Sequence, residues 1–151
     1  MKRLSLIAAV LLLYACALPR IIILEDPLSA EEHLNLGVAY ERSGELEYAV
    51  REYRLALKKE SSARAHLYLG NALFLDRQYG EAETNYRKAI KKAKGTEAAD
   101  AYNNLAWLLF TRKRELKKAE GYCLKALALD PSKEEIYRDT LNKIRVAGES
   151  D

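Results

Sequence analysis

From residue 29 onward, apolar residues recur along the chain at the spacing of an α-helix. They fall in pairs of runs of about a dozen residues each, and a breaker such as Ser43-Gly44 separates the two runs of a pair. Each run is long enough for a helix and each breaker is short enough for a tight turn. The pattern therefore predicts an all-α fold built from helical hairpins.

The hairpins are copies of one another. Residues 33–37 (HLNLG) return as residues 66–70 (HLYLG), and a third copy carries Leu105-Ala106 where the second has Leu69-Gly70. We expect three extra residues in the loop around Gly95 and one more in the turn at residues 112–115. Both insertions then fall between helices, where added chain costs little.

Small residues hold matching positions in both helices of each copy, and large residues fill the space around them. A small residue at a helix crossing lets two helices approach closely. The small residues are Gly37, Gly70 and Ala106 in the first helices and Ala49, Ala82 and Ala119 in the second helices. The large ones are Tyr40, Tyr53, Leu73, Tyr86 and Leu109.

This period and this order of residues resemble the tetratricopeptide repeat (TPR), with its leucine-glycine, tyrosine, alanine, aromatic and proline positions. The resemblance covers about residues 29–146, and residues 126–131 (ALALDP) reproduce the end of the family's repeat. Cys123 stands where the family has an aromatic residue.

The resemblance implies a right-handed superhelical solenoid of three helical hairpins, at about residues 30–62, 63–98 and 99–131. A capping helix at residues 132–146 and a polar tail at 147–151 would follow. Ser132 is the predicted N-cap of the last helix. Its predicted apolar face comprises Ile136, Tyr137, Leu141 and Ile144.

The chain length suits one domain. Its formal net charge is +3, but Lys2 and Arg3 account for two of the 25 basic residues, which leaves 23 against 22 acidic ones. Nucleic acid binding would need a concentrated basic surface. We therefore expect no nucleic acid partner.

The first residues have the pattern of an export signal. Lys2 and Arg3 precede an apolar run at residues 4–13 that is too short to span a bilayer. Residues 13–16 (LYAC) resemble the bacterial lipobox. That resemblance implies a signal peptide at residues 1–15, lipidation of Cys16 and an anchored linker at residues 16–28. An uncleaved anchor and plain secretion are the alternatives.

A lipidated Cys16 would place the protein in the bacterial cell envelope, facing the periplasm, and Ala17 after it favours the outer membrane. Several acyl chains give the firm anchoring that one chain does not. Residues 21–24 (IIIL) either pack on the first helix or act as a spacer between lipid and domain.

No catalytic, metal or cofactor motif is present in the sequence, so we expect a protein that is not an enzyme and holds no cofactor. His33 and His66 occupy the same repeat position, which indicates packing rather than a metal pair. Cys123 occupies a core position and is expected to be a buried small hydrophobe. With Cys16 lipidated, it would have no disulfide partner.

In TPR proteins the first helix of each repeat lines a concave groove that binds a protein or peptide partner. The corresponding positions here are rich in amides and aromatic rings. They are Leu34, Asn35, Val38, Tyr68, Asn71, Phe74, Asn103, Asn104, Trp107 and Phe110.

Asn35 and Asn104 share one repeat position and resemble the asparagine ladder with which some TPR proteins hold a peptide backbone, although Tyr68 interrupts it. A clamp for a C-terminal carboxylate is not expected, since Asn103 and Trp107 stand where charge would be needed. The alternative for Trp107 and Phe110 is that the capping helix covers them.

The resemblance implies a lipoprotein scaffold that takes part in an envelope assembly. The alternative is an accessory module or chaperone of an exported enzyme such as a cysteine peptidase, because residues 103–106 (NNLA) and 139–141 (DTL) resemble TPR segments fused to such enzymes. A basic turn at residues 112–118 either faces solvent or contacts anionic lipid headgroups.

Overall fold

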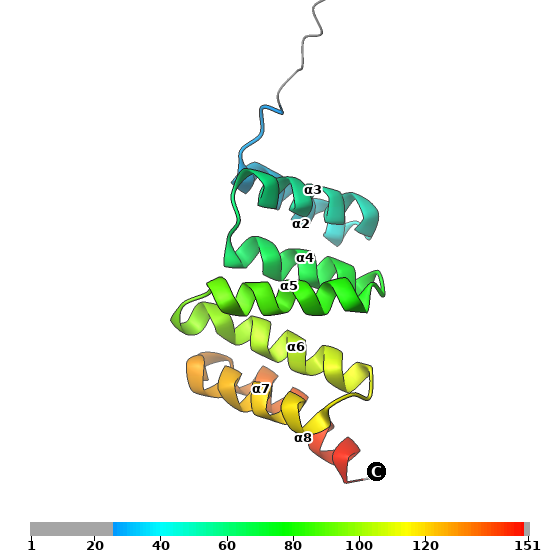
Figure 1. Cartoon of the computed structure of the whole chain (residues 1–151), viewed down its shortest axis with the longest axis vertical. Helices are drawn as coiled ribbons and strands as arrows, with labels where there is room; N and C mark the ends of the chain where they lie inside the picture. The colour runs from blue at the N-terminus through cyan, green and yellow to red at the C-terminus, as the bar shows by residue number, and fades with distance from the viewer. Residues whose placement is uncertain (1–25, 150–151) are drawn as a thin grey trace, which may run out of the picture.

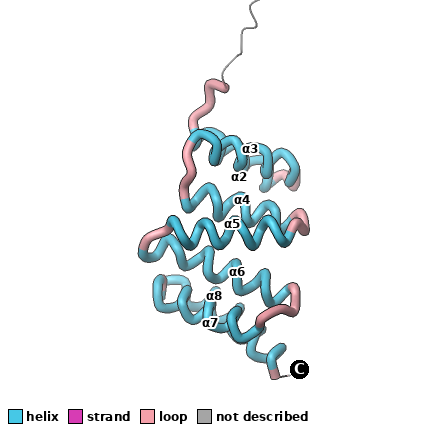
Figure 2. Tube along the Cα trace, viewed as in Figure 1, coloured by secondary structure: helices cyan, strands magenta, loops and turns pink. Residues whose placement is uncertain are grey.

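The computed structural model describes residues 26–149, so the signal peptide, Cys16 and residues 21–24 lie outside the described part. Figures 1 and 2 show this part as a stack of α-helices with short loops and without strands. The helices are α2 (Ala30–Arg42), α3 (Leu46–Lys59), α4 (Ala63–Leu75), α5 (Tyr79–Lys92), α6 (Ala99–Thr111), α7 (Leu116–Leu129) and α8 (Glu134–Gly148). The predicted all-α fold, with three hairpins and a capping helix, is confirmed. No helix within residues 26–149 is long and apolar enough to cross a bilayer.

Three hairpins, α2/α3, α4/α5 and α6/α7, follow one another along the long axis of the molecule (Figure 1). Within each hairpin the two helices pack along their length, and α8 packs on α7. The first helices of successive hairpins also contact one another, α2 with α4 and α4 with α6, and α6 contacts the capping helix α8. Their outward faces therefore form one continuous surface.

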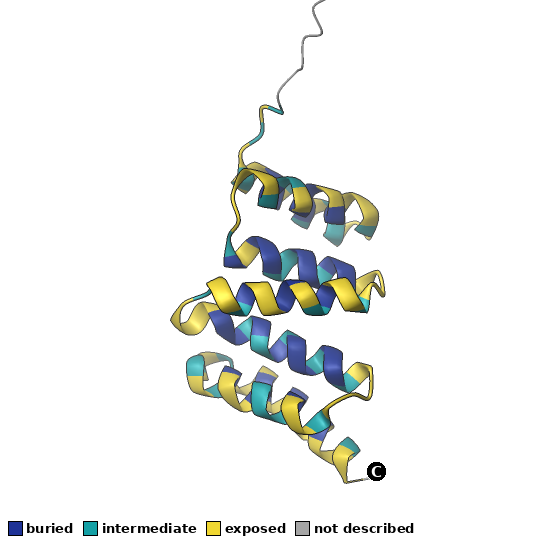
Figure 3. Ribbon diagram, in the orientation of Figure 1, coloured by how far each residue is buried: buried dark blue, intermediate teal, exposed yellow. Residues whose placement is uncertain are grey.

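Close approach within the hairpins depends on glycine in the first two repeats. A Cβ atom on Gly37 would lie 2.4 Å from Cε1 of Tyr53, and one on Gly70 would lie 2.6 Å from Cε1 of Tyr86. Both rings are buried. The third repeat has Ala106 and the smaller Cys123 at these two positions, and both are fully buried. Figure 3 shows buried residues gathered along α4 and α6, the first helices of the second and third hairpins.

The turns inside the hairpins share one backbone feature. Gly44, Arg77 and Lys113 occupy equivalent places, and each has a positive φ, of 80°, 60° and 49° respectively. Only the first of them is glycine, which adopts this region without steric cost. The third turn holds one more residue than the others, and Glu115 there also has a positive φ, of 50°.

The other predicted insertion forms a 3₁₀ turn at Gly95–Ala98, directly before α6. It places Ala98 in the core and leaves Gly95 exposed with a φ of 55°. Both insertions lie between helices, as the repeat offsets predict.

The start of the capping helix differs from the prediction. A short 3₁₀ helix at Pro131–Lys133 precedes α8, and the Asp130 side chain accepts the backbone N–H of Ser132. Ser132 is therefore not the N-cap of α8. Ile136 is also not part of the buried face, because its side chain is 59% exposed.

The capping helix is held on α6 by one acidic side chain. Asp100 accepts a hydrogen bond of 2.8 Å from the Tyr137 hydroxyl and an ion pair of 2.6 Å from Lys133. Tyr137, Leu141 and Ile144 are buried on the same side of α8. They close the core at the end of the stack.

Candidate peptide-binding surface

The outward faces of α2, α4 and α6 form what we call the first-helix surface. Among the predicted groove residues, Asn35 is exposed and seven others are half-buried. The half-buried residues are Val38, Tyr68, Asn71, Phe74, Asn104, Trp107 and Phe110. The two other predicted groove residues, Leu34 and Asn103, are buried.

Two amides of neighbouring repeats are joined on this surface. The Asn104 side chain donates a hydrogen bond of 2.8 Å from Nδ2 to Oδ1 of Asn71. The two residues come from different repeat positions, because Asn71 corresponds to Val38 and Asn104 corresponds to Asn35. The arrangement is thus a bridge between α4 and α6. Each amide keeps further donor and acceptor capacity for a ligand.

Aromatic rings lie on both sides of this bridge and are braced by other rings. Tyr68 lies 5.8 Å from the ring of Tyr53, and Phe74 lies 5.5 Å from the ring of Tyr79. Such offset or edge-on pairs are favourable. The bracing keeps the half-buried rings in fixed positions, where they can contact a ligand.

The surface continues onto the capping helix. Trp107 lies 5.1 Å from the ring of Phe110, and the Lys143 ammonium lies 5.3 Å from the Trp107 ring. A hollow of about 510 Å³ lies between α6 and α8 at this point. It is lined by Asn103, Asn104, Trp107, Glu135, Ile136, Asp139, Thr140 and Lys143.

The capping helix therefore flanks Trp107 and leaves its ring half-buried. Ile136, Asp139 and Lys143 of α8 belong to this end of the surface, and the sequence did not identify them as site residues. Their spacing along the sequence places them on one face of the helix, beside the buried face that contains Tyr137 and Ile144. This spacing is the feature of the sequence from which they could have been identified.

The two histidines are buried and hydrogen-bonded in this structure. His33 is buried, and its two ring nitrogens each lie 2.8 Å from a carboxylate oxygen, of Glu52 and of Asp26. Burial opposes ionisation of Glu52, but the hydrogen bonds from His33 and Arg51 outweigh it and hold the pKa of Glu52 below its usual value. His66 is buried in the second repeat, 3.0 Å from Asn85.

Cys123 is fully buried, as expected of a small hydrophobe in the core. Burial raises the pKa of its thiol to about 12, so the sulfur stays protonated and unreactive at neutral pH. Among residues 26–149, no group of histidine, cysteine and acidic side chains is arranged to hold a metal ion.

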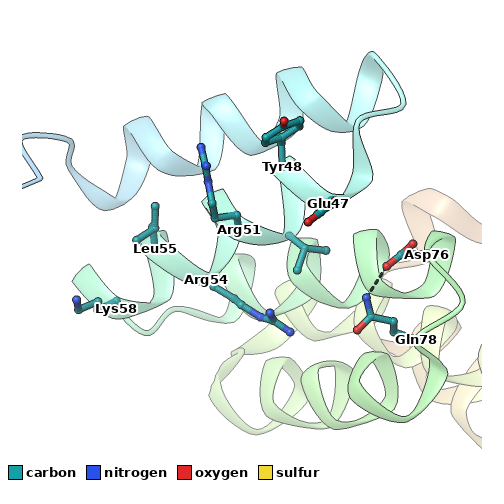
Figure 4. A pocket seen from close by; sticks show the side chains of 9 residues that line it. Glu47, Tyr48, Arg51, Arg54, Leu55, Lys58, Asp76 and Gln78 are labelled. Atoms are coloured by element: carbon teal, nitrogen blue, oxygen red, sulfur yellow. Dashed lines mark hydrogen bonds between the residues drawn. The ribbon is translucent and has the colours of Figure 1, made fainter.

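A second hollow, of about 690 Å³, lies along α3 and against the turn between α4 and α5 (Figure 4). Arg51, Arg54 and Lys58 line it along α3, with the guanidinium of Arg51 5.5 Å from the ring of Tyr48. None of its lining residues belongs to the first-helix surface. It is a separate feature, and its lining includes the acidic Glu47 and Asp76 besides the three basic residues.

The sequence matches the model of the tetratricopeptide repeat over residues 34–95 and again over residues 76–134. Together these matches span most of the described part of the chain. The protein belongs to the tetratricopeptide-repeat family. No curated protein matches it significantly.

Solved structures of several TPR proteins are similar to this chain. PilF of Pseudomonas aeruginosa is 30% identical with a TM-score of 0.68, and the match covers 83% of this chain and 59% of PilF. The TPR2B domain of yeast Sti1, in complex with pHsp70, is 23% identical with a TM-score of 0.73, covering 81% of this chain and 98% of that domain.

The Yersinia enterocolitica type III secretion chaperone SycD, in complex with a peptide of the translocator YopD, is 21% identical with a TM-score of 0.68. That match covers 77% of this chain and 92% of SycD. At these identities the two peptide complexes establish the shared fold. The family itself is one of protein-binding modules.

Proposed function

We propose that this protein is a cell-envelope scaffold that binds an extended segment of a partner protein on the first-helix surface. One observation carries the proposal: the Asn71–Asn104 bridge lies between half-buried, braced aromatic rings that no other helix covers completely. Two similar structures were determined with peptides or peptide-like partners, which supports this use of the fold.

The two kinds of side chain have different tasks in such binding. A carboxamide both donates and accepts, so Asn35, Asn71 and Asn104 suit the N–H and C=O groups of an extended backbone. Tyr68 and Trp107 offer apolar area, which supplies most of the affinity at protein interfaces. The amides would fix the direction of the segment without selecting its sequence.

The experiment is a binding measurement between the purified protein and a partner identified by site-specific photo-crosslinking from Asn71. Asn104→Ala should weaken binding by about 0.5–1.5 kcal/mol, the net value of one hydrogen bond. Trp107→Ala should cost about 2 kcal/mol or more. Neither change should unfold the protein, because both side chains are only half-buried.

The matched control uses the first turn of α7, next to residues 112–115, where Lys117→Glu and Lys118→Glu change two exposed charges. These changes should alter salt or membrane behaviour without changing affinity on the first-helix surface. The assignment fails if the asparagine and tryptophan variants bind as tightly as the unchanged protein while the turn variants do not bind.

The place of the protein in the envelope is supported only by the sequence of residues 1–17, which lie outside the described residues. Metabolic labelling with a fatty acid should mark the protein, and Cys16→Ser should abolish the label. Equal labelling of both forms, or no label on the unchanged protein, would contradict lipidation and leave the first-helix surface as a separate question.

A further inference from the structure

The three repeats share one site at the hairpin edge, where a residue early in the first helix faces the second helix. In the first repeat this residue is His33. Asp26, from the segment before α2, places its carboxylate 2.8 Å from Nε2 of His33, and Lys59 donates a 2.6 Å hydrogen bond to the Asp26 backbone carbonyl. The first site is therefore filled by an acidic residue of the chain itself.

The third repeat fills the same site with aromatic rings. Tyr102 replaces the histidine and lies 5.8 Å from the ring of Tyr122, which takes the place of Glu52. The Lys125 ammonium lies 5.5 Å from the Tyr102 ring and 5.9 Å from the Tyr122 ring. The third site is therefore filled by two rings and one cation of the chain itself.

The second repeat keeps the histidine and the lysine but has no acidic residue to fill the site. A hollow of about 440 Å³ is present there. We call it the lysine pocket, and it is lined by Ser61, His66, Lys88, Lys91 and Lys92. No carboxylate lines it, and within residues 26–149 none of the three lysines forms an ion pair.

The bonds of His66 show how the pocket could accept an anion. Nδ1 lies 3.0 Å from Oδ1 of Asn85, an oxygen that can only accept, so Nδ1 carries the proton. Nε2 lies 3.3 Å from the Ser61 hydroxyl, at the edge of the pocket. Burial lowers the pKa of His66, and the charges of Lys88 and Lys92 lower it further against the opposing bond to Asn85.

We propose that the lysine pocket binds an acidic side chain in an extended segment of a partner protein, as the first repeat binds Asp26. Lys92 corresponds to Lys59, which contacts a backbone carbonyl, and His66 corresponds to His33, which contacts the carboxylate. Recognition of both groups favours a peptide over a free anion. Lys88 adds a charge that the first repeat lacks, because its counterpart is Leu55, whereas Lys91 corresponds to Lys58.

This site is independent of the first-helix surface, since it lies between α4 and the C-terminal end of α5. It acts by charge, and that surface acts through amides and aromatic rings. Loss of one would leave the other intact.

The probe is an acetylated and amidated peptide with the sequence of residues 25–29 (EDPLS), titrated into the full-length protein and followed by NMR. We expect the imidazole signal of His66 to shift, and its pKa to rise on saturation, because a nearby carboxylate favours the protonated ring. Lys88→Glu with Lys92→Glu should weaken binding at least about tenfold, as expected for lost charge-assisted hydrogen bonds.

Three controls are matched to this test. The Asp26→Asn form of the peptide removes the charge of that side chain and keeps the charge of Glu25. Lys117→Glu with Lys118→Glu changes the same number of exposed lysines away from the pocket. Trp107→Ala alters the first-helix surface and should leave peptide binding unchanged, which separates this proposal from the proposed function.

The proposal is overturned if the Asp26→Asn peptide binds as tightly as the unchanged peptide, or if the unchanged peptide does not bind. It is also overturned if the peptide shifts His33 in place of His66, since it would then be displacing Asp26 in the first repeat. Inorganic phosphate and phosphatidylglycerol vesicles complete the test. Binding of either one with loss in the Lys88→Glu/Lys92→Glu variant, without peptide binding, would make the pocket a phosphate or headgroup site.

Discussion

The contact between Gly70 and Tyr86 is a direct test of how the hairpins pack. In Gly70→Ala the new Cβ would lie 2.6 Å from Cε1 and 2.7 Å from Cδ1 of Tyr86, where van der Waals contact needs well over 3 Å. The ring is 2% exposed and has little room to retreat. Such overpacking costs about 1–3 kcal/mol, while alanine gains about 1 kcal/mol of helix propensity over glycine. We expect a net loss of up to about 2 kcal/mol.

The third repeat indicates how this clash can be relieved. There Ala106 stands opposite Cys123, which is much smaller than tyrosine, and both residues are fully buried. Tyr86→Cys alone should cost about 3 kcal/mol or more, because it leaves a cavity in the core. In the Tyr86→Cys background, Gly70→Ala should become neutral or stabilising, since the added methyl group then meets no ring.

Urea unfolding of the four proteins, followed by far-UV circular dichroism, gives the coupling energy as a double-mutant cycle. We expect about 2 kcal/mol in favour of the double variant. Ala106→Gly is the matched control. It should cost no more than about 1–2 kcal/mol, because it removes a methyl group and some helix propensity without adding a clash. A coupling energy within about 0.5 kcal/mol of zero would refute the steric explanation for the glycine.

Three further measurements address the turns, the helix crossings and the buried histidine. Arg77→Gly should raise the free energy of unfolding, measured with urea, by about 0.5–1 kcal/mol, because Arg77 holds a φ of 60° that glycine adopts without strain. Gly44→Ala should lower the free energy of unfolding. Ala82→Leu should destabilise by about 1–3 kcal/mol in a thermal melt, since Ala82 is fully buried; an unchanged melting temperature would contradict the crossing. The pKa of His66 is below its usual 6.5, so the unfolded chain binds more protons than the folded one just below that pH, and stability should fall as the pH drops from about 6.5. His66→Gln should remove this loss, and an identical pH dependence in that variant would show that another group is responsible.

The fold could be predicted from the sequence because the repeat determines it. Gly37 and Gly70 lie in the first helices opposite Tyr53 and Tyr86, and the register that aligns them also aligns the turns. A helical hairpin follows from the 3.6-residue period and a breaker, and stacking follows from the small residues at the crossings. The start of α8 was predicted wrongly, because Asp130 caps the preceding 3₁₀ helix and leaves Ser132 outside α8.

The site was less predictable, because repeat positions describe backbones and not side-chain contacts. Asn35 and Asn104 share a position, yet the bond that forms joins Asn104 to Asn71 on the neighbouring helix. The alignment of the repeats alone does not show whether Asn104 bonds to an amide at its own repeat position or to Asn71 at another. Burial also depends on neighbours outside the repeat, so the capping helix decides how much of Trp107 is exposed.

The edge site shows the same limit more clearly. His33 and His66 share one repeat position, so the sequence predicted the same role for both. Their surroundings differ, because the segment before α2 is free to bring Asp26 to His33, whereas the chain before α4 is the short connection from α3 and brings only Ser61. Equivalent residues therefore acquire different chemistry from whatever precedes each repeat.

Two binding surfaces of unlike character on one small solenoid would respond differently to salt. Attraction at the lysine pocket is screened over about 8 Å at physiological ionic strength, and its three lysines are exposed to that screening. Amide bonds and aromatic contacts on the first-helix surface carry no net charge and change little with salt. A partner that engaged both surfaces through one linked segment would gain avidity without any new contact on either. Raising the salt concentration would then lower its affinity only to the value that the first-helix surface provides alone. Lys88→Glu with Lys92→Glu should leave the same residual affinity.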